Sequence, residues 1–321
     1  MSGHEAHSAR IVAGTLTLLS REIHQVGRPV TLWSPEIEPE FIRETAAKVA
    51  AGKALPLWVE ERHPARGLAV YIGSPWESEI LGLPCGRLAG PFMVVEDQID
   101  RENRVRKLAR LAIEQGKLAG HKMIISKTIH DPAVLRGFLA EGFVLAEIGA
   151  SLKGDVPEES GRPLESLPQG FCFLSGEELK EVAEEAVETL GDFFYDGHFR
   201  HDPVPGPEAA ARLWSRVALD DLNGLAEPAL LLWDRSRNRA GGLATVRRDG
   251  YRARLSILAV SPHYQGRGFG RRLMAEVLSR LEGRAREIDV ETSSYNLPAL
   301  SLYLSLGLVH TTPLAALHCH L

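Results

Sequence analysis

Ile-Leu-Ala-Val-Ser-Pro-His-Tyr-Gln-Gly-Arg-Gly-Phe-Gly, residues Ile257–Gly270, is the stretch around which the rest of the chain can be interpreted. Its apolar beginning predicts a strand over Leu255–Val260, and apolar residues at helical spacing after Gly270 predict a helix. The glycines between them would let backbone N–H groups at the helix start approach an anion closely. Strand, turn and helix together therefore predict a site for phosphate or pyrophosphate.

Three kinds of phosphate-binding loop can be compared with this turn. The P-loop pattern Gly-x-x-x-x-Gly-Lys-Ser/Thr does not occur in the chain. The dinucleotide pattern Gly-x-Gly-x-x-Gly is not met either, because the third glycine comes one residue early. Gln265, Gly268 and Gly270, preceded by Val260 and Pro262, fit a third pattern, Gln/Arg-x-x-Gly-x-Gly/Ala. This run resembles the acetyl-CoA pyrophosphate loop of the GNAT N-acetyltransferases.

The resemblance implies acetyl-CoA as cosubstrate and a defined set of residues around it. These residues are Leu258, Ala259, Val260, Gln265, Gly266, Arg267, Gly268, Phe269, Gly270, Arg271, Asn296, Ala299 and Tyr303. Arg267, Arg271 and Arg272 lie near a helix N-terminus, where cations are normally disfavoured. A bound polyanion would offset that cost.

A second run of residues follows on the next predicted helix. Asn296 can cap this helix, and Tyr303 lies about two turns later on the same side. The run Asn296-x-x-Ala299-x-x-x-Tyr303 resembles the second GNAT signature. The resemblance implies that Asn296 contacts the pantetheine arm and that Tyr303 protonates the departing thiolate as general acid. The amine would attack the thioester directly, with backbone N–H groups near Val260 stabilising the oxyanion.

The general base and the acceptor-binding residues are less sharply defined. Glu291, on the strand after the glycine-turn helix, is one candidate base, and His201 is another. His198, Arg200, His201 and Asp202 are candidates for acceptor binding, since acceptor loops of the GNAT fold occur between its first two helices. Deprotonation relayed through water is equally open.

The chain contains a faint internal repeat with an offset of 165 residues. Matching residues are Asp131 and Asn296, Leu135 and Leu300, Phe138 and Tyr303, and Gly142 and Gly307. Strand, capped helix, glycine and strand thus occur twice, but the first copy has no glycine turn, and Phe138 has no hydroxyl. We therefore expect a duplicated unit whose first copy has lost the cofactor site.

The expected fold is α/β, of the α+β type, with two GNAT-like mixed, mostly antiparallel sheets flanked by helices. We predict a truncated unit without a cofactor loop at 61–153, a Pro- and Gly-rich linker at 154–170 and a catalytic domain at 171–321. Residues 1–60 are expected to form an extension of unassigned role, with short strands at Thr15–Leu19 and Pro29–Trp33. The chain is expected to finish in a strand pair, which leaves room for a homodimer.

Composition narrows the class of protein further. The 321 residues are 44% hydrophobic, with a formal net charge of −5 and three scattered cysteines. The charge and the lack of a basic stripe argue against nucleic acid, and the absence of a long apolar run or leader pattern argues against a membrane span or export. We expect a cytoplasmic enzyme with no metal and free thiols.

A more specific resemblance begins at about residue 74. Ser74–Gly82, the helix ending before Gly142, Phe199-Arg200 and a helix with Trp214 are similar in order to features of the dTDP-fucosamine acetyltransferases. The resemblance implies a nucleotide-linked amino sugar as acceptor. Two alternatives stay open: a tandem GNAT enzyme acting on another amine, such as an amino acid, a thiol precursor or a protein N-terminus, and a non-catalytic acyl-CoA sensor.

Overall fold

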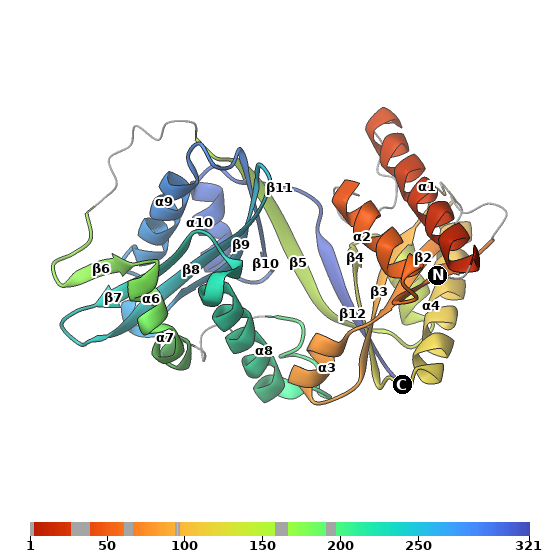
Figure 1. Ribbon diagram of the computed structural model, residues 1–321, viewed down its shortest axis with the longest axis horizontal. Coiled ribbons are helices and arrows are strands. Elements are labelled where there is room, and N and C mark those ends of the chain that lie inside the picture. The colour runs from red at the N-terminus through yellow and green to blue at the C-terminus, as the bar shows by residue number, and fades with distance from the viewer. Residues whose placement is uncertain are drawn as a thin grey trace. The chain divides into compact units, whose positions relative to one another are not determined.

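The computed structural model describes residues 3–26, 39–60, 67–93, 95, 97–157, 166–190 and 197–321. They group into two compact units, an N-terminal unit of Met1–Gly149 with Thr312–Leu321 and a C-terminal unit of Ala150–Thr311 (Figure 1). Strand β5 (Val144–Asp155) contributes its first half to the N-terminal unit and its second half to the C-terminal unit. These boundaries differ from the predicted ones at 153 and 171, and part of the predicted linker lies outside the described residues.

The N-terminal unit is a mostly antiparallel sheet with helices packed on it. Its elements are α1 (Gly3–Val26), α2 (Pro39–Ala50), β1 (Ala54–Trp58), β2 (Leu68–Gly73), α3 (Pro75–Leu81), β3 (Cys85–Phe92), α4 (Gln98–Leu118), β4 (Met123–Ile129), α5 (Pro132–Leu139), the first half of β5 and β12 (Leu314–His320). The strand order is β1-β2-β3-β4-β12-β5, and β3 and β4, which α4 connects, are parallel.

Within residues 1–60, the described elements α1, α2 and β1 contribute buried side chains to this unit's core. Ala9, Val12 and Leu16 of α1 are buried at helical spacing, and they share a cluster with Val49, Leu68 and other residues of the sheet. Thr15–Leu19, expected as a strand, lies inside α1, because this spacing serves a helix face better than a strand face. The expected strand at Pro29–Trp33 lies outside the described residues.

The C-terminal unit has its own mixed sheet. Its elements are β6 (Phe171–Leu174), α6 (Glu177–Glu181), α7 (Ala183–Leu190), α8 (Gly206–Asp220), the π-helical turn η3 (Asp221–Leu225), β7 (Ala229–Asp234), β8 (Arg239–Asp249), β9 (Arg252–Val260), the 3₁₀ turn η4 (Pro262–Tyr264), α9 (Phe269–Leu281), β10 (Glu287–Ser293), α10 (Leu297–Ser305) and β11 (Val309–His310). The strand order is β5-β10-β9-β8-β7-β6, with β11 also on β5. Strands β9 and β10, which α9 connects, are parallel.

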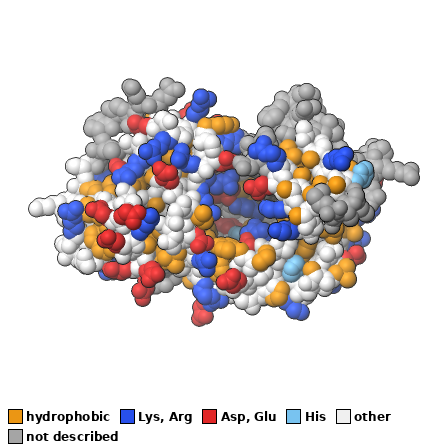
Figure 2. Space-filling model, viewed as in Figure 1, with side chains coloured by type: hydrophobic (Ala, Val, Ile, Leu, Met, Phe, Trp, Pro, Cys, Tyr) orange, Lys and Arg blue, Asp and Glu red, His pale blue; other side chains and the backbone are white. Residues whose placement is uncertain are grey.

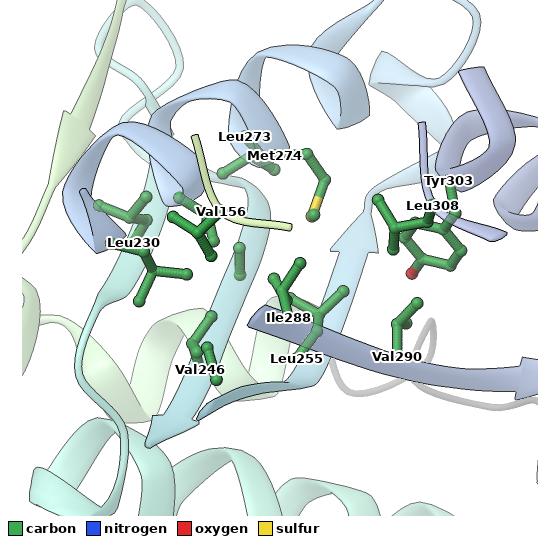
Figure 3. Close-up of a cluster of buried hydrophobic side chains, with 14 of the residues drawn as sticks. Val156, Leu230, Val246, Leu255, Leu273, Met274, Ile288, Val290, Tyr303 and Leu308 are labelled. Carbon is green, nitrogen blue, oxygen red and sulfur yellow. The ribbon is translucent and has the colours of Figure 1, made fainter. Parts of the chain in front are cut away.

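One core cluster of the C-terminal unit lies between α9 and the sheet, and another joins α6, α7 and α8 to β7, β8 and β9. Leu273 and Met274 of α9 pack over Leu230, Val246 and Leu255 of the strands, all buried (Figure 3). On the visible face of the unit, acidic and basic side chains are interspersed with apolar ones (Figure 2). Among the described residues, every helix is too short or too polar to cross a lipid bilayer.

The end of the chain departs from the predicted strand pair. β11 pairs with β5, whereas β12 pairs antiparallel with both β4 and β5 of the N-terminal unit. Its residues Leu317 and His318 are fully buried. The two units nevertheless share one succession of elements: antiparallel strands, a helix, a parallel strand, and a short helix capped by Asp131 in one and by Asn296 in the other. This shared order of elements is compatible with the predicted repeat, which stays a prediction.

Candidate active site

The site of the C-terminal unit begins where two parallel strands separate. β9 pairs with β10 only from Arg252 to Leu255, whereas it pairs with β8 as far as Val260. A register shift between Thr245 and Val246 of β8 leaves Ser256 without an opposite residue, which is a β-bulge. Because a bulge bends its strand and increases its twist, the end of β9 diverges from β10 just beyond this point.

A pocket of about 970 Å³ lies along this separation. Its lining residues come from β9, the glycine turn, the start of α9, the end of β10 and α10, with two from the α8 region. They include Arg200, Trp214, Ser256, Leu258, Ala259, Val260, Tyr264, Gln265, Gly266, Gly268, Phe269, Gly270, Arg271, Glu291, Thr292, Asn296, Ala299, Ser301, Tyr303 and Ser305. All these residues belong to the C-terminal unit.

The glycine turn has the conformation that an anion cradle needs. Gly266 and Gly268 have φ of 72° and 76°, a left-handed backbone that side chains disfavour. Gly268 is the N-cap of α9, whose first turn carries no acidic residue. The Gln265 side chain donates to the Val260 carbonyl at 2.9 Å, which closes the turn onto the strand. Unpaired N–H groups of α9 and its dipole favour negative charge here.

The three arginines near this turn have different surroundings. Arg271 lines the pocket, and its Nη2 donates to Ser305 Oγ of α10 at 2.7 Å. Arg272 turns back and donates to the Arg267 carbonyl at 3.0 Å, while the Arg267 guanidinium lies 5.9 Å from the Tyr264 ring centroid. Only Arg271 of the three lines the pocket.

Tyr264 anchors the turn in the core, a role that the sequence did not indicate. It is 1% exposed, packs edge-on against Phe171, and its hydroxyl donates to Asp234 Oδ2 at 2.8 Å. Burial by itself would raise the pKa of Asp234, but hydrogen bonds from Ser236 and Tyr264 hold that pKa below its ordinary value. The Asp234 carboxylate thus fixes Tyr264, the residue directly before Gln265.

The second predicted run of residues faces the same pocket. Asn296 caps α10 by accepting from the Ala299 N–H at 3.3 Å, and its Nδ2 donates to Thr292 Oγ1 at 3.1 Å. Tyr303 is 4% exposed at the end of the core cluster, next to Leu308 and Val290 (Figure 3). Among the described residues, no group is hydrogen-bonded to its hydroxyl. Burial raises the pKa of Tyr303, so the phenol stays protonated.

The predicted base and acceptor residues are not all brought together. Glu291 and Arg200 line the pocket and are exposed, whereas His198, His201 and Asp202 are absent from its described lining. His201 Nε2 lies 2.5 Å from the hydroxyl of Tyr295, a residue outside the predicted set. Asp202 is 2% exposed and accepts from the Val204 N–H at 2.8 Å, which is the arrangement of a turn residue.

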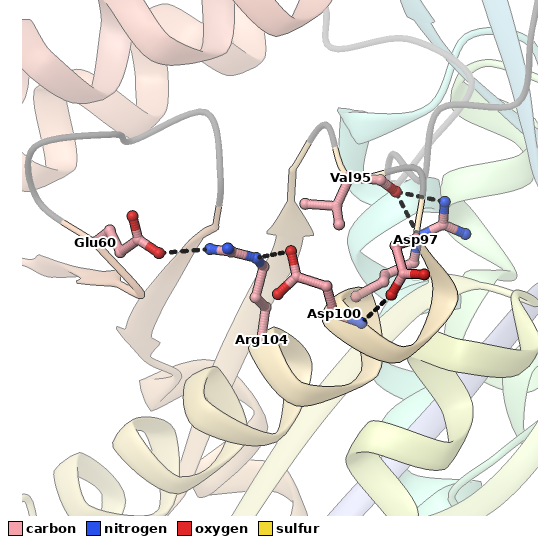
Figure 4. A network of polar contacts seen from close by, with 6 residues as sticks. Glu60, Val95, Asp97, Asp100 and Arg104 are labelled. Atoms are coloured by element: carbon pink, nitrogen blue, oxygen red, sulfur yellow. Dashed lines mark hydrogen bonds and ion pairs between the residues drawn. The ribbon is translucent and has the colours of Figure 1, made fainter.

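The N-terminal unit has a different arrangement at the corresponding helix. Helix α4 begins after Asp97, whose side chain caps it by accepting from the Asp100 N–H at 2.7 Å (Figure 4). Arg104 then bonds both Asp100 and Glu60, at 2.9 and 3.0 Å. The first turn of α4 therefore carries carboxylates, and its N-terminal end is capped from within the protein.

Comparisons with known proteins agree with this geometry. Residues 193–308 match the model of the acetyltransferase (GNAT) family, a segment that runs from before α8 to beyond α10. Most of the elements that form the pocket lie in that segment. A comparison with curated proteins found no match. The part of the chain that forms the pocket is therefore similar to the GNAT acetyltransferase family.

Solved structures resemble the chain over most of its length. One is a GCN5-related N-acetyltransferase from Sphaerobacter thermophilus, with 13% identity, a TM-score of 0.56, and coverage of 86% of this chain and 85% of that one. Another is a tandem GNAT protein from the clavulanic acid biosynthesis pathway, solved without acetyl-CoA, with 12% identity, a TM-score of 0.56 and coverage of 97% and 95%. A third, a GCN5-related N-acetyltransferase from Kribbella flavida, has 13% identity, a TM-score of 0.54 and coverage of 86% and 94%.

These likenesses establish the fold, and the family match covers the part of it that forms the pocket. The family match and this fold together support an acyltransferase. Within the described residues, no group of three or more His, Cys, Asp or Glu side chains is arranged to hold a metal ion.

Proposed function

We propose that the C-terminal unit transfers the acetyl group of acetyl-CoA to a small primary amine. One observation carries the proposal: the glycine turn and Tyr303, which are far apart in sequence, line the same pocket. In this assignment the turn from Gln265 to Gly270 and Arg271 hold the pyrophosphate, and Asn296 lies along the pantetheine arm. The left-handed backbone at Gly266 and Gly268, with no acidic residue in the first turn of α9, supports this fit.

The proposed reaction is a direct displacement. The amine nitrogen attacks the thioester carbonyl, the C–S bond breaks, and the Tyr303 hydroxyl gives its proton to the sulfur. The raised pKa of Tyr303 keeps its hydroxyl protonated at neutral pH. Burial also makes the departing thiolate more basic, so the thiolate can still accept this proton. Backbone N–H groups at the open edge of β9, near Val260, would stabilise the oxyanion. Glu291, exposed in the pocket lining, is the proposed base, directly or through water.

A nucleotide-linked amino sugar is the first proposed acceptor. The exposed Arg200 and the indole of Trp214 in the pocket lining support it, because a guanidinium can pair with phosphate and an aromatic ring can cover a sugar or base. We assign the N-terminal unit the role of a cofactor-free scaffold, since the first turn of α4 presents Asp97 and Asp100 where an anion site would need N–H groups.

The general-acid role is tested with Tyr303→Phe, which keeps the ring and removes only the hydroxyl. Thiol release with a panel of amines should fall by about 10²–10³-fold in kcat, while acetyl-CoA binding measured by calorimetry stays the same. Tyr251→Phe is the matched control, since Tyr251 is 52% exposed and outside the pocket. Unchanged kcat for Tyr303→Phe would sink the assignment.

The same panel tests the acceptor. It should contain a dTDP-linked amino sugar, free amino acids and a peptide with a free N-terminus. A higher kcat/KM for the nucleotide sugar supports the first choice, and a higher value for another amine replaces it. Acetyl-CoA binding without transfer to any of them would favour a sensor.

A further inference from the structure

The N-terminal unit contains a second pocket, of about 640 Å³, among β1, β2 and the end of α4. Leu55 and Pro56 supply part of an apolar wall, and Lys53, Gln115 and His121 supply polar groups. No Asp or Glu is among the described lining residues, so Lys53 leaves the pocket with a net positive charge. This pocket shares no lining residue with the one in the C-terminal unit.

A tyrosine–histidine pair forms the inner end of this pocket. Tyr71 of β2 is 4% exposed, and its hydroxyl lies 2.7 Å from Nδ1 of His121, which follows α4. The two rings are tilted by 32° with centroids 5.8 Å apart. Among the described residues, no group is hydrogen-bonded to the other ring nitrogen, Nε2.

Two glycines hold the pair in position. A Cβ atom at Gly86 of β3 would collide with the Tyr71 hydroxyl and come within 2.9 Å of His121 Nδ1. A Cβ atom at Gly116 of α4 would come within 3.0 Å of the same hydroxyl. The sheet and the helix therefore approach the pair from two directions, and neither leaves room for a side chain. This close fit fixes the position of the imidazole and therefore of its second ring nitrogen, Nε2.

The burial of Tyr71 and His121 determines which of their atoms carry protons. Burial, with smaller effects of Cys85 and Cys319, raises the pKa of Tyr71 to about 12, so the phenol keeps its proton. That buried O–H needs an acceptor, and His121 Nδ1 is the one it has. Burial also lowers the pKa of His121, so the ring is neutral at pH 7 and carries its own proton on Nε2. The pair thus presents a fixed N–H donor.

We propose that this pocket binds a small monocarboxylate with an apolar body. His121 Nε2–H and the Lys53 ammonium would bind the carboxylate, and Leu55 and Pro56 would cover the apolar part. One cation and one neutral donor match a single negative charge, whereas a doubly charged phosphate would be left partly unpaired. Tyr71 is a positioning residue that fixes the tautomer of His121.

The experiment uses the full chain without acetyl-CoA and observes the His121 imidazole by NMR. The probes are isovalerate, phenylacetate and inorganic phosphate. Isovalerate or phenylacetate should shift the Nε2–H resonance with a millimolar Kd. Lys53→Ala, at an exposed position, should weaken binding by about 5–10-fold, and His121→Leu by at least about 10-fold. Lys122→Ala, at an exposed lysine outside the pocket, should leave the Kd unchanged.

Tyr71→Phe tests whether Tyr71 fixes the tautomer of His121, because the loss of a residue with a purely structural role would not change that tautomer. Without the phenol, Nδ1–H and Nε2–H tautomers should both appear in the ¹⁵N spectrum, and carboxylate affinity should fall by about 2–5-fold. The proposal is overturned if no carboxylate shifts His121, if Lys53→Ala and Lys122→Ala bind alike, or if phosphate binds more tightly than the carboxylates. Acetyl transfer is not measured, so failure here leaves the proposed function of the C-terminal unit untouched.

Discussion

The placement of β12 in the N-terminal unit predicts where Leu317→Ala will destabilise the protein. Leu317 is 0% exposed, and β12 is hydrogen-bonded on both sides, to β4 and to β5. Removing three buried carbons costs about 2.4 kcal/mol at ~0.8 kcal/mol for each. The residual cavity raises the expected cost to about 3–4 kcal/mol, within the range for buried Leu→Ala changes.

Hydrogen exchange by mass spectrometry locates the effect, which a single melting curve of a two-unit protein would not. A loss of 3 kcal/mol corresponds to more than about 100-fold faster exchange where opening is the limiting equilibrium. The increase should appear over β4 and the first half of β5, while β7 to β9 keep their protection. Leu118→Ala, at a position 83% exposed in the same unit, is the matched control and should change nothing. Faster exchange confined to β7–β9, or no change over β4, would refute the placement of β12.

Three further predictions concern the C-terminal unit. Gly268→Ala should weaken acetyl-CoA binding in calorimetry, because the left-handed backbone costs about 1–2 kcal/mol with a Cβ and Arg272 Nη1 lies 2.8 Å from where that Cβ would be; an unchanged Kd would argue against the cradle. Ionisation of Tyr303 should not lower the wild-type kcat at any pH up to about 10, because the raised pKa keeps the phenol protonated. A decrease in kcat at alkaline pH that disappears in Tyr303→Phe would contradict this prediction. Because the folded-state pKa of Asp234 is lowered, its contribution is present above the unfolded value of about 3.9 and is lost as pH falls through the folded value. Tyr264→Phe, which removes a bond to Asp234, should cost about 1–3 kcal/mol at pH 7 and less at pH 3 by urea unfolding, and an equal cost at both would be inconsistent with this linkage.

The sequence predicted local features of the site well. The Gln265–Gly270 turn, the cap at Asn296 and the strand predicted at Leu255–Val260 depend on glycine conformation, capping and apolar pattern over a few residues. Each of these signals acts between neighbours in the chain, so it can be recognised before any tertiary structure is known.

Features that depend on distant partners were missed. The bulge at Ser256 exists because of a register shift against β8, and the role of Tyr264 depends on Asp234, thirty residues earlier. Part of α1 was predicted as a strand, because polar and apolar residues alternate over Thr15–Leu19. The segment is helical because its apolar residues at helical spacing pack on the sheet. One pattern along β9 could have indicated the pocket wall. Half-buried residues alternate there with buried ones, and the half-buried Ser256, Leu258 and Val260 line the pocket.

The position of β12 also sets the order in which the protein can fold during its synthesis. β4 and β5 leave the ribosome early, but the strand that joins them is made only after the whole of Ala150–Thr311. At about 5–20 residues per second, this delay lasts roughly 10–30 s. During that interval the edges of β4 and β5 that β12 will pair with have no partner strand. Open strand edges are prone to pair with other chains. The C-terminal unit, translated second, can complete its sheet first.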